Sequence, residues 1–234
     1  MRKRQRLGQH FLISQSIAKK IVSAANITIK DTILEIGTGQ GILIPYLCKN
    51  AKKVISIESD KTLYENAKMN FINFPNLILK NGNGFKTSDK FSLFVSNLPY
   101  SQSRLALEWL IQKNFSRAII MVQKEFAEKL LTSDKKRRSI TILVNYALKM
   151  EPLMNVKKTN FKPPPKVDST VLKLTRKKTI SKELIKTVNQ LFSYRRKKLK
   201  NVLKQFGTFI ESDSRIEEIP GDEIIKIAKQ IIKK

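Results

Sequence analysis

The chain has 234 residues, of which 41% are hydrophobic, and this content is enough for a packed core and excludes global disorder. It carries 46 basic and 19 acidic side chains, a formal net charge of +27, and a field of that sign concentrates polyanions at the protein surface. We therefore expect a nucleic-acid partner, with solubility as the simpler alternative.

Cysteine and histidine are too scarce for several kinds of site. The single cysteine, Cys48, excludes an intrachain disulfide and a cysteine-based metal site, and the single histidine, His10, has no evident triad partner. We expect no bound metal. The basic N-terminal segment lacks the apolar stretch of a signal peptide, and no apolar run approaches membrane-spanning length. We expect a cytoplasmic protein that does not bind membranes.

Short apolar segments alternate with helical patterns in the first half of the chain. The predicted strands are TILEI (32–36), KVISI (53–57), LIL (77–79), SLFV (92–95) and AIIMV (118–122). This alternation is typical of a parallel sheet with helices on both faces, and such sheets bind ligands beyond the carboxyl ends of their strands. Four loops are therefore expected to share one rim and to form a site, namely 37–41, 58–60, 81–84 and 97–100.

The alternation of strands and helices ends beyond the strand AIIMV (118–122) and the helical stretch that follows it. A connector stiffened by proline, NFKPPPKVDS (160–169), leads into TVLKLT (170–175), whose alternation predicts a late strand. The rest of the chain has a helical pattern and is very basic. We therefore predict an α/β domain over residues 1–178 and a small basic helical domain over residues 179–234.

The first rim loop, LEIGTGQGIL, places Gly37, Gly39 and Gly41 between a strand and a helix. Glycines let the backbone turn sharply and approach a ligand closely. The G-x-G-x-G spacing matches neither the six-residue dinucleotide fingerprint nor a phosphate-binding P-loop. A plain tight turn is the alternative.

The second and third loops add polar groups to the same rim. Glu58 ends the next strand, and an acidic residue at this offset from a glycine-rich turn can accept the hydroxyls of a ribose. Asn83 can pair with the edge of an adenine, although asparagine is also a common turn residue. The glycine-rich turn and Glu58 together predict a cofactor of the adenosine type.

The fourth loop, within VSNLPYSQS (95–103), follows a buried strand with an amide, a rigid turn and an aromatic ring. This loop could form a binding site for a flat molecule with polar edges, such as a nucleobase. Its residues are Asn97, Leu98, Pro99 and Tyr100. A strand-ending turn followed by a core tyrosine is the alternative.

These loops occur with four further motifs, LGQHFL (7–12), MVQKEFAEKL (121–130), FKPPPKVDS (161–169) and RRKKLKNVL (195–203). Together, over about residues 7–206, they resemble the ribosomal RNA adenine N6,N6-dimethyltransferase family. The resemblance implies a Rossmann-like methyltransferase sheet and S-adenosylmethionine as cofactor. It also implies action on adenosines near the 3′ end of small-subunit ribosomal RNA. We expect the RNA to be part of a pre-ribosomal small-subunit particle and the enzyme to be a monomer.

The resemblance assigns the cofactor to residues of the rim and of the N-terminal motif. The implied cofactor-binding residues are His10, Leu12, Gly37, Gly39, Glu58, Asn83 and Asn97. The family more often has Asn at the position of His10 and normally has Asp at the position of Asn83. Asparagine keeps an acceptor oxygen but lacks the charge.

The target adenine is assigned to the fourth loop and the connector. The Asn97 side-chain oxygen and the Leu98 carbonyl would accept the hydrogens of adenine N6, and Pro99 would fix the turn. Tyr100 and Phe161 would stack on a base that has left its helix. For Phe161, a hydrophobic anchor for the connector is the alternative.

Basic runs without interleaved acidic residues predict contacts with RNA phosphates, although part of each run faces water. The residues assigned to RNA are Arg137, Arg138, Arg195, Arg196, Lys197 and Lys198. The affinity for RNA should therefore fall steeply with salt.

Three other functions remain open at this point. One is a large-subunit ribosomal RNA adenine methyltransferase of the antibiotic-resistance type, which shares the rim loops. Another is a non-catalytic RNA-binding descendant of the fold, and the third is a DNA adenine methyltransferase.

Overall fold

The computed structural model describes residues 9–131 and 138–233, which form two compact units. The sheet unit comprises the described residues up to Ala106, together with Asn114–Ala127 and Met150–Arg176. The helical unit comprises the described residues of Leu107–Lys113, of Glu128–Lys149 and from Lys177 onward. The sequence predicted one boundary at residues 178/179, whereas the helical unit also takes in two earlier segments.

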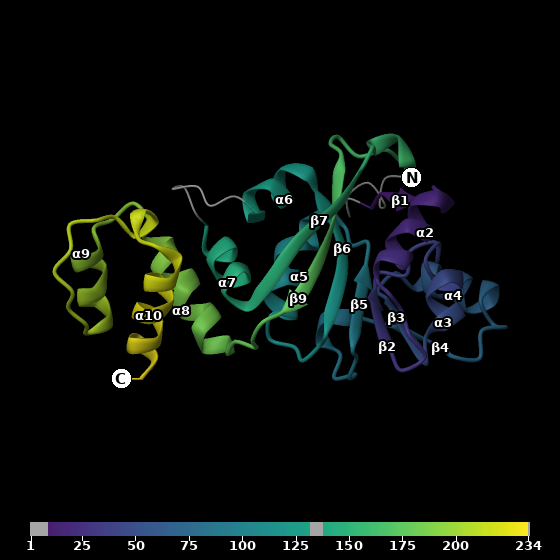
Figure 1. Cartoon of the computed structure of the whole chain (residues 1–234), viewed down its shortest axis with the longest axis horizontal. Coiled ribbons are helices and arrows are strands. Elements are labelled where there is room, and N and C mark those ends of the chain that lie inside the picture. Colours follow the sequence, from purple (N-terminus) through teal and green to yellow (C-terminus); the bar gives the residue numbers. More distant parts are fainter. Residues whose placement is uncertain (1–8, 132–137, 234) are drawn as a thin grey trace. The chain divides into compact units, whose positions relative to one another are not determined.

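A sheet of seven strands supports the sheet unit (Figure 1). The strands are β2 (Thr32–Ile36), β3 (Lys53–Glu58), β4 (Leu77–Asn81), β5 (Leu93–Ser96), β6 (Arg117–Gln123), β7 (Leu148–Val156) and β9 (Ser169–Arg176). Their order is β4-β3-β2-β5-β6-β9-β7, and the strands from β4 to β6 are parallel, whereas β9 runs antiparallel to β6. The six strands predicted from the sequence are all present.

The parallel strands form because each is a run of apolar residues that can be buried on both faces. Ile33, Leu34, Leu93 and Phe94 are fully buried. The chain adds β3 and β4 on one side of β2 and then returns to add β5 and β6 on the other side. Doubly wound sheets bind ligands at such a reversal of strand order. The loops after β2 and β5 lie at that point.

Helices of the sheet unit connect the strands. They are α2 (Gln15–Ala24), α3 (Ile44–Asn50) and α4 (Lys61–Asn70), while α5 (Ser103–Leu110) and α6 (Lys124–Leu131) contribute residues to both units. The side chain of Asp60 caps α4 by accepting a hydrogen bond of 3.1 Å from the Leu63 N–H. This cap fixes where the chain turns after Glu58.

A pair of two-residue strands joins the N-terminal motif to the proline connector. Strand β1 (Phe11–Leu12) runs antiparallel to β8 (Phe161–Lys162), with Leu12 opposite Phe161. The Ile13 N–H adds a hydrogen bond of 2.9 Å to the Asn160 carbonyl. The sequence pattern did not predict this pairing, which holds the N-terminal motif against the sheet unit.

The helical unit is built from amphipathic helices. They are α7 (Ser139–Ala147), α8 (Lys182–Ser193), α9 (Leu199–Leu203) and α10 (Gly221–Ile232). Helix α10 packs against α7 and α8, and α7 packs against α8. Helix α10 buries Ile224, Ile225 and Ala228, which lie at helical spacing, whereas Ile232 is 40% exposed. Within residues 9–131 and 138–233, no helix combines the length and apolarity that crossing a bilayer requires.

Candidate functional site

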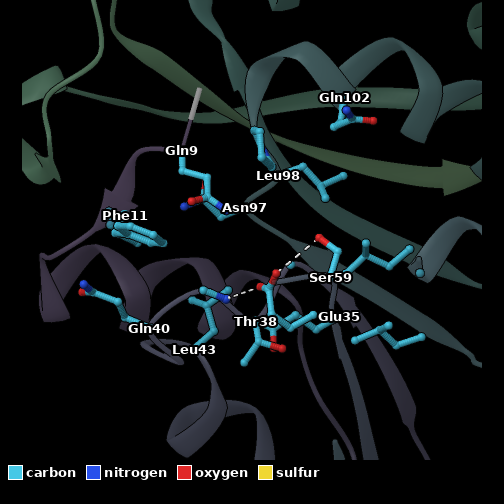
Figure 2. A pocket seen from close by; sticks show the side chains of 18 of the residues that line it. Gln9, Phe11, Glu35, Thr38, Gln40, Leu43, Ser59, Asn97, Leu98 and Gln102 are labelled. Carbon is cyan, nitrogen blue, oxygen red and sulfur yellow. Dashed lines mark hydrogen bonds between the residues drawn. The ribbon is translucent and has the colours of Figure 1, made fainter. Parts of the chain in front are cut away.

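A cavity of about 300 Å³ opens at the carboxyl ends of the parallel strands (Figure 2). Its volume lies at the lower end of the range for small-molecule sites. All seven residues predicted to hold a cofactor line this cavity, namely His10, Leu12, Gly37, Gly39, Glu58, Asn83 and Asn97. The four rim loops and the N-terminal motif therefore meet around one space.

Glu58 is held rigidly at the end of β3. Its carboxylate accepts hydrogen bonds of 2.9 Å from the Gly39 N–H and 2.9 Å from the Asp60 N–H. The backbone of Gly39 has a φ of +58°, which favours glycine, and this conformation points its N–H at the carboxylate. A carboxylate has about four acceptor positions, so Glu58 keeps capacity for the hydroxyl groups of a ligand.

Glu35 also lines the cavity, and sequence reasoning missed it. Its carboxyl group accepts a hydrogen bond of 2.5 Å from the Ser56 hydroxyl, which lies 2.6 Å from the Thr38 hydroxyl. Burial raises the pKa of Glu35 to about 8, and the negative charge of Glu58 acts in the same direction. Glu35 is therefore mostly protonated at neutral pH. The available signal was an acidic residue inside the apolar strand TILEI.

Asn83 shapes the third loop. Its side-chain oxygen accepts a hydrogen bond of 3.0 Å from the Phe85 N–H and so caps the short helix η1 (Gly84–Lys86). An amide oxygen has a second lone pair, and the amide nitrogen has two hydrogens to donate. Asn83 can therefore cap η1 and still meet the edge of a ligand, as an aspartate at this position could.

The loop that carries Asn97 is attached to the glycine-rich turn by a hydrogen bond and by side-chain packing. The Ser96 hydroxyl donates to the Ile36 carbonyl, which ties the end of β5 to the end of β2. Leu98 is 7% exposed, and its side chain lies against Gly37. In the described part of the chain, no hydrogen bond uses the Asn97 side chain, so both of its polar atoms can serve a ligand. Figure 2 shows Asn97 and Leu98 beside the cavity.

Tyr100 and Phe161 lie outside the cavity lining. The Tyr100 hydroxyl is 2.6 Å from the Ser169 hydroxyl, and burial raises the pKa of Tyr100. Its ring faces that of His10, with 5.8 Å between centroids and 31° between planes. Phe161 is 3% exposed and belongs to the core. The structure therefore brings His10, rather than Phe161, next to Tyr100, and the stacking roles stay predictions.

The N-terminal motif supplies more of the lining than was predicted. Gln9 and Phe11, the sequence neighbours of His10, also line the cavity, and Figure 2 shows both. The Gln9 side-chain oxygen is buried and has no hydrogen-bond partner among the described residues. The His10 Nδ1–H donates a hydrogen bond of 2.8 Å to the Pro163 carbonyl, which orients the imidazole. Gln102, after the Asn97 loop, also contributes.

The described residues among those assigned to RNA belong to the helical unit. Arg137 lies outside the described residues, and Arg138 is exposed at the start of α7. In the basic run 195–198, Arg195 forms an ion pair of 3.5 Å with Glu217, and Lys198 forms one of 2.9 Å with Asp213. An acidic segment that is distant in sequence thus neutralises part of this run.

The other two assigned cations in this run, Arg196 and Lys197, form no such ion pair with any residue that the structure describes. The Lys197 ammonium lies 5.0 Å from the centroid of the Tyr194 ring. The Arg196 carbonyl accepts a hydrogen bond of 3.3 Å from the Arg215 guanidinium. The RNA-binding assignments of Arg196 and Lys197 stay predictions.

The lining fits a nucleoside that carries a charged amino-acid group. Glu58 offers acceptor capacity to a ribose, and the glycine-rich turn leaves room for close approach. The Gln9 oxygen and the Asn97 side chain, which have no hydrogen-bond partners among the described residues, offer further polar contacts. S-adenosylmethionine has both kinds of group.

A doubly wound sheet with this cavity at its reversal point defines the chain as a Rossmann-like methyltransferase. Over residues 1–233 the sequence matches the family described as ribosomal RNA adenine dimethylase, and the chain belongs to that family. Membership confirms the predicted enzyme class. Family and fold together imply the use of S-adenosylmethionine.

Relatives support this placement along nearly the whole chain. The chain is 34% identical to ribosomal RNA small subunit methyltransferase A of Thermotoga maritima, over 97% of this chain and 85% of the relative. It is 32% identical to the probable ribosomal RNA small subunit methyltransferase A of Methanopyrus kandleri, over 95% of this chain and 85% of the relative.

Solved structures confirm the predicted fold. A dimethyladenosine transferase from Plasmodium falciparum matches with a TM-score of 0.79 and 28% identity, over 96% of this chain and 98% of that one. The 23S rRNA methyltransferase ErmE matches with a TM-score of 0.70 and 20% identity, over 95% of this chain and 99% of that one. The second likeness concerns the fold alone.

Proposed function

We propose that this protein transfers methyl groups from S-adenosylmethionine to N6 of adenosines near the 3′ end of small-subunit ribosomal RNA, giving N6,N6-dimethyladenosine. The observation that carries the proposal is the Asn97 side chain, which has no hydrogen-bond partner among the described residues and lines a cavity that fits an adenosine cofactor. The relatives named small subunit methyltransferase A favour that RNA. We take the substrate to be a pre-ribosomal particle, and the enzyme to act as a monomer in the cytoplasm.

The seven cavity residues assigned to the cofactor would hold it together, and five of them would have separate roles. Glu58 would accept the ribose hydroxyls, and Asn83 would meet the adenine edge. His10 and Leu12 would cover the cofactor, and the backbone of Gly37 would approach its amino-acid end. The bound cofactor supplies a methyl group on a positively charged sulfur, which is already a good leaving group.

Asn97 and Leu98 would prepare adenine N6 for reaction. The N6 lone pair is delocalised into the ring, so the amino group is a poor nucleophile. The Asn97 side-chain oxygen and the Leu98 carbonyl would accept the N6 hydrogens, two in the first transfer and one in the second, which draws the nitrogen toward tetrahedral geometry and frees the lone pair. In each transfer the bond from N6 to the methyl carbon would form as the carbon–sulfur bond breaks, and N6 would lose one hydrogen as a proton to solvent. Pro99 would keep these acceptors in place. The alignment of N6 with the methyl carbon and the sulfur would then account for most of the rate gain.

A base must leave its stack to reach the Asn97 loop. We propose that Tyr100 supports the extruded adenine with its ring. Phe161 would join it only if its ring leaves the core, because it is 3% exposed. The imidazole of His10 already lies beside Tyr100.

The test is methyl transfer to isolated small-subunit particles that lack the modification. We expect Asn97→Ala to lower the rate about 100-fold or more, comparable to losing one preorganised polar group in other active sites. Its Kd for S-adenosylmethionine, measured by calorimetry, should change far less. Asn66→Ala, at an exposed position on α4, is the matched control and should keep the wild-type rate.

Mapping of the product by primer extension separates the alternatives. Methylated adenosines near the 3′ end of the small-subunit RNA support the proposal. Methylation of large-subunit RNA instead would favour the resistance-type enzyme. A wild-type protein that binds RNA but no S-adenosylmethionine would be a non-catalytic binder.

A further inference from the structure

The helical unit holds two ammonium groups around one aromatic ring. Tyr146, near the end of α7, is half-buried. The Lys178 ammonium lies 4.1 Å from its ring centroid, and the Lys229 ammonium lies 5.2 Å from it. The Lys229 ammonium also donates a hydrogen bond of 2.7 Å to the Tyr146 hydroxyl. Three segments distant in sequence thus converge on one point.

These cations lack acidic partners. Among the residues that the structure describes, no ion pair includes Lys177, Lys178 or Lys229. The contrast is with Arg195, Lys198 and Lys200 in the RRKKLKNVL motif, which all pair with acidic groups. The most basic stretch of the sequence is therefore partly neutralised, whereas the ion pairs of the described residues leave Lys177, Lys178 and Lys229 uncompensated.

Holding two ammonium groups together has an energetic cost. Both lie close to the same ring centroid, so their separation is less than the Debye length of about 10 Å at 0.1 M salt. The ring face attracts each cation by only about 0.5–1 kcal/mol at an exposed site. An anion placed between the two would relieve their repulsion. The hydrogen bond from Lys229, together with both positive charges, lowers the pKa of Tyr146.

Three lysines of the α10 segment form a row of positive charge that includes Lys229. Lys226, Lys229 and Lys233 are all exposed and lie three and four residues apart, which places them on one side of the helix. Seven residues of helix span about 10 Å, so the row can follow several charges of an extended polyanion. Lys177 lies next to Lys178, and its ammonium donates a hydrogen bond of 3.0 Å to the Asn145 carbonyl.

We propose that a surface centred on Tyr146 binds the sugar-phosphate backbone of the substrate RNA. This Tyr146 surface consists of Tyr146, Lys177, Lys178, Lys226, Lys229 and Lys233. The choice of RNA as the polyanion rests on the proposed function. Lysine ammonium groups on flexible stems suit phosphates rather than base edges, so the surface would add affinity without reading sequence. It would act together with the unpaired part of the RRKKLKNVL motif.

The test compares two double variants that remove the same charge. Lys178→Gln/Lys229→Gln alters the Tyr146 surface. Lys30→Gln/Lys52→Gln is the matched control, at exposed positions just before β2 and β3. The probe is a fluorescent transcript of the 3′-terminal region of small-subunit RNA, and anisotropy gives its Kd at a series of KCl concentrations.

We expect the slope of log K against log[KCl] to become shallower by roughly 1.5–2 in the first variant, for two lost phosphate contacts. The control should keep the wild-type slope, and Lys178→Arg/Lys229→Arg should restore it. All variants should unfold near the wild-type temperature, because the changed side chains are exposed.

An unchanged slope in the first variant, or an equal change in the control, would overturn the proposal. So would a loss of binding to vesicles containing phosphatidylserine with RNA binding intact, since the surface would then serve lipid. Methyl transfer is assayed separately. A shallower slope in a protein that transfers no methyl group would leave the Tyr146 surface standing and remove the proposed function.

Discussion

Glu35 is a carboxyl group at 1% exposure beneath the glycine-rich turn. Its partner is the Ser56 hydroxyl, which also lies within hydrogen-bond distance of Thr38. A carboxylate at this position would be desolvated and would face the negative charge of Glu58. The folded protein avoids both costs by keeping a proton on Glu35.

Replacing Glu35 should therefore change how stability depends on pH. The pKa of Glu35 rises from 4.5 to about 8 on folding, so the folded protein binds the extra proton between these values. The stability that this proton provides is complete below about pH 4.5 and is lost as the pH rises toward 8. Glu35→Gln cannot ionise, so the wild-type Tm should fall relative to the Tm of the variant over this range.

Thermal unfolding at a series of pH values checks this expectation. Glu65→Gln, at an exposed position on α4, is the control and should follow the wild-type curve. If the curves for wild type and Glu35→Gln run parallel from pH 5 to 8, Glu35 carries no such proton.

For single residues, the sequence predicted which side chains of the site lie together, but it did not predict the protonation state of Glu35. Gly37, Glu58, Asn83 and Asn97 follow the ends of parallel strands, so their convergence follows from strand order alone. The protonation of Glu35 depends on its three-dimensional surroundings, and no spacing encodes them.

Gly41 shows how one element constrains another. It lies between β2 and α3, with a φ of +76°. A Cβ atom at Gly41 would come within 2.1 Å of the Phe71 ring, at the end of α4. The turn therefore needs glycine because a neighbouring helix ends against it, in addition to any need of a ligand.

A substitution at Gly41 should cost more than one at Gly207, where the backbone is equally unusual. Gly207 has a φ of +62°, but nothing lies within 4 Å of a Cβ atom placed there. We expect Gly207→Ala to lower the free energy of unfolding by about 1–2 kcal/mol, from backbone strain alone. Gly41→Ala should lose a further 1–3 kcal/mol from overpacking. Urea denaturation measures both, and equal losses would argue against the contact with Phe71.

Strands β1, β7 and β8 were not predicted from the sequence, and there is a physical reason why their sequences lack a strand pattern. Strand β7 contains Pro152 and several polar residues, and its place at the sheet edge tolerates both. Strands β1 and β8 have two residues each, which is too short for any periodicity. The central strands were predictable because burial on both faces requires continuous apolar runs.

At the scale of the whole chain, the helical unit is not a simple C-terminal tail. Helix α7 precedes the predicted boundary at residues 178/179, yet it packs against α8 and α10, which follow it. Ile140, Leu143 and Val144 of α7 are buried. The two-domain division at that boundary is a proposal about independent folding, and it can be tested directly.

A fragment of residues 1–178 would keep α7 and lose the helices that cover it. We expect this fragment to expose apolar surface and to aggregate, because a cut there separates partners within one compact unit. Size-exclusion chromatography and binding of a hydrophobic dye would show this, with the full chain as reference. A monodisperse fragment that unfolds at the temperature of the full chain would instead support the predicted boundary.

The pairing of β1 with β8 also sets when the cavity lining can be completed during synthesis. His10 and Pro163 are hydrogen-bonded although they are 153 residues apart. A ribosome adds about 5–20 residues per second, so roughly 8–30 seconds of synthesis separate the two partners. Until Pro163 emerges, a growing chain cannot fix His10 and Leu12 over the cavity. The growing chain therefore stays without the complete lining of this cavity until Pro163 has been added.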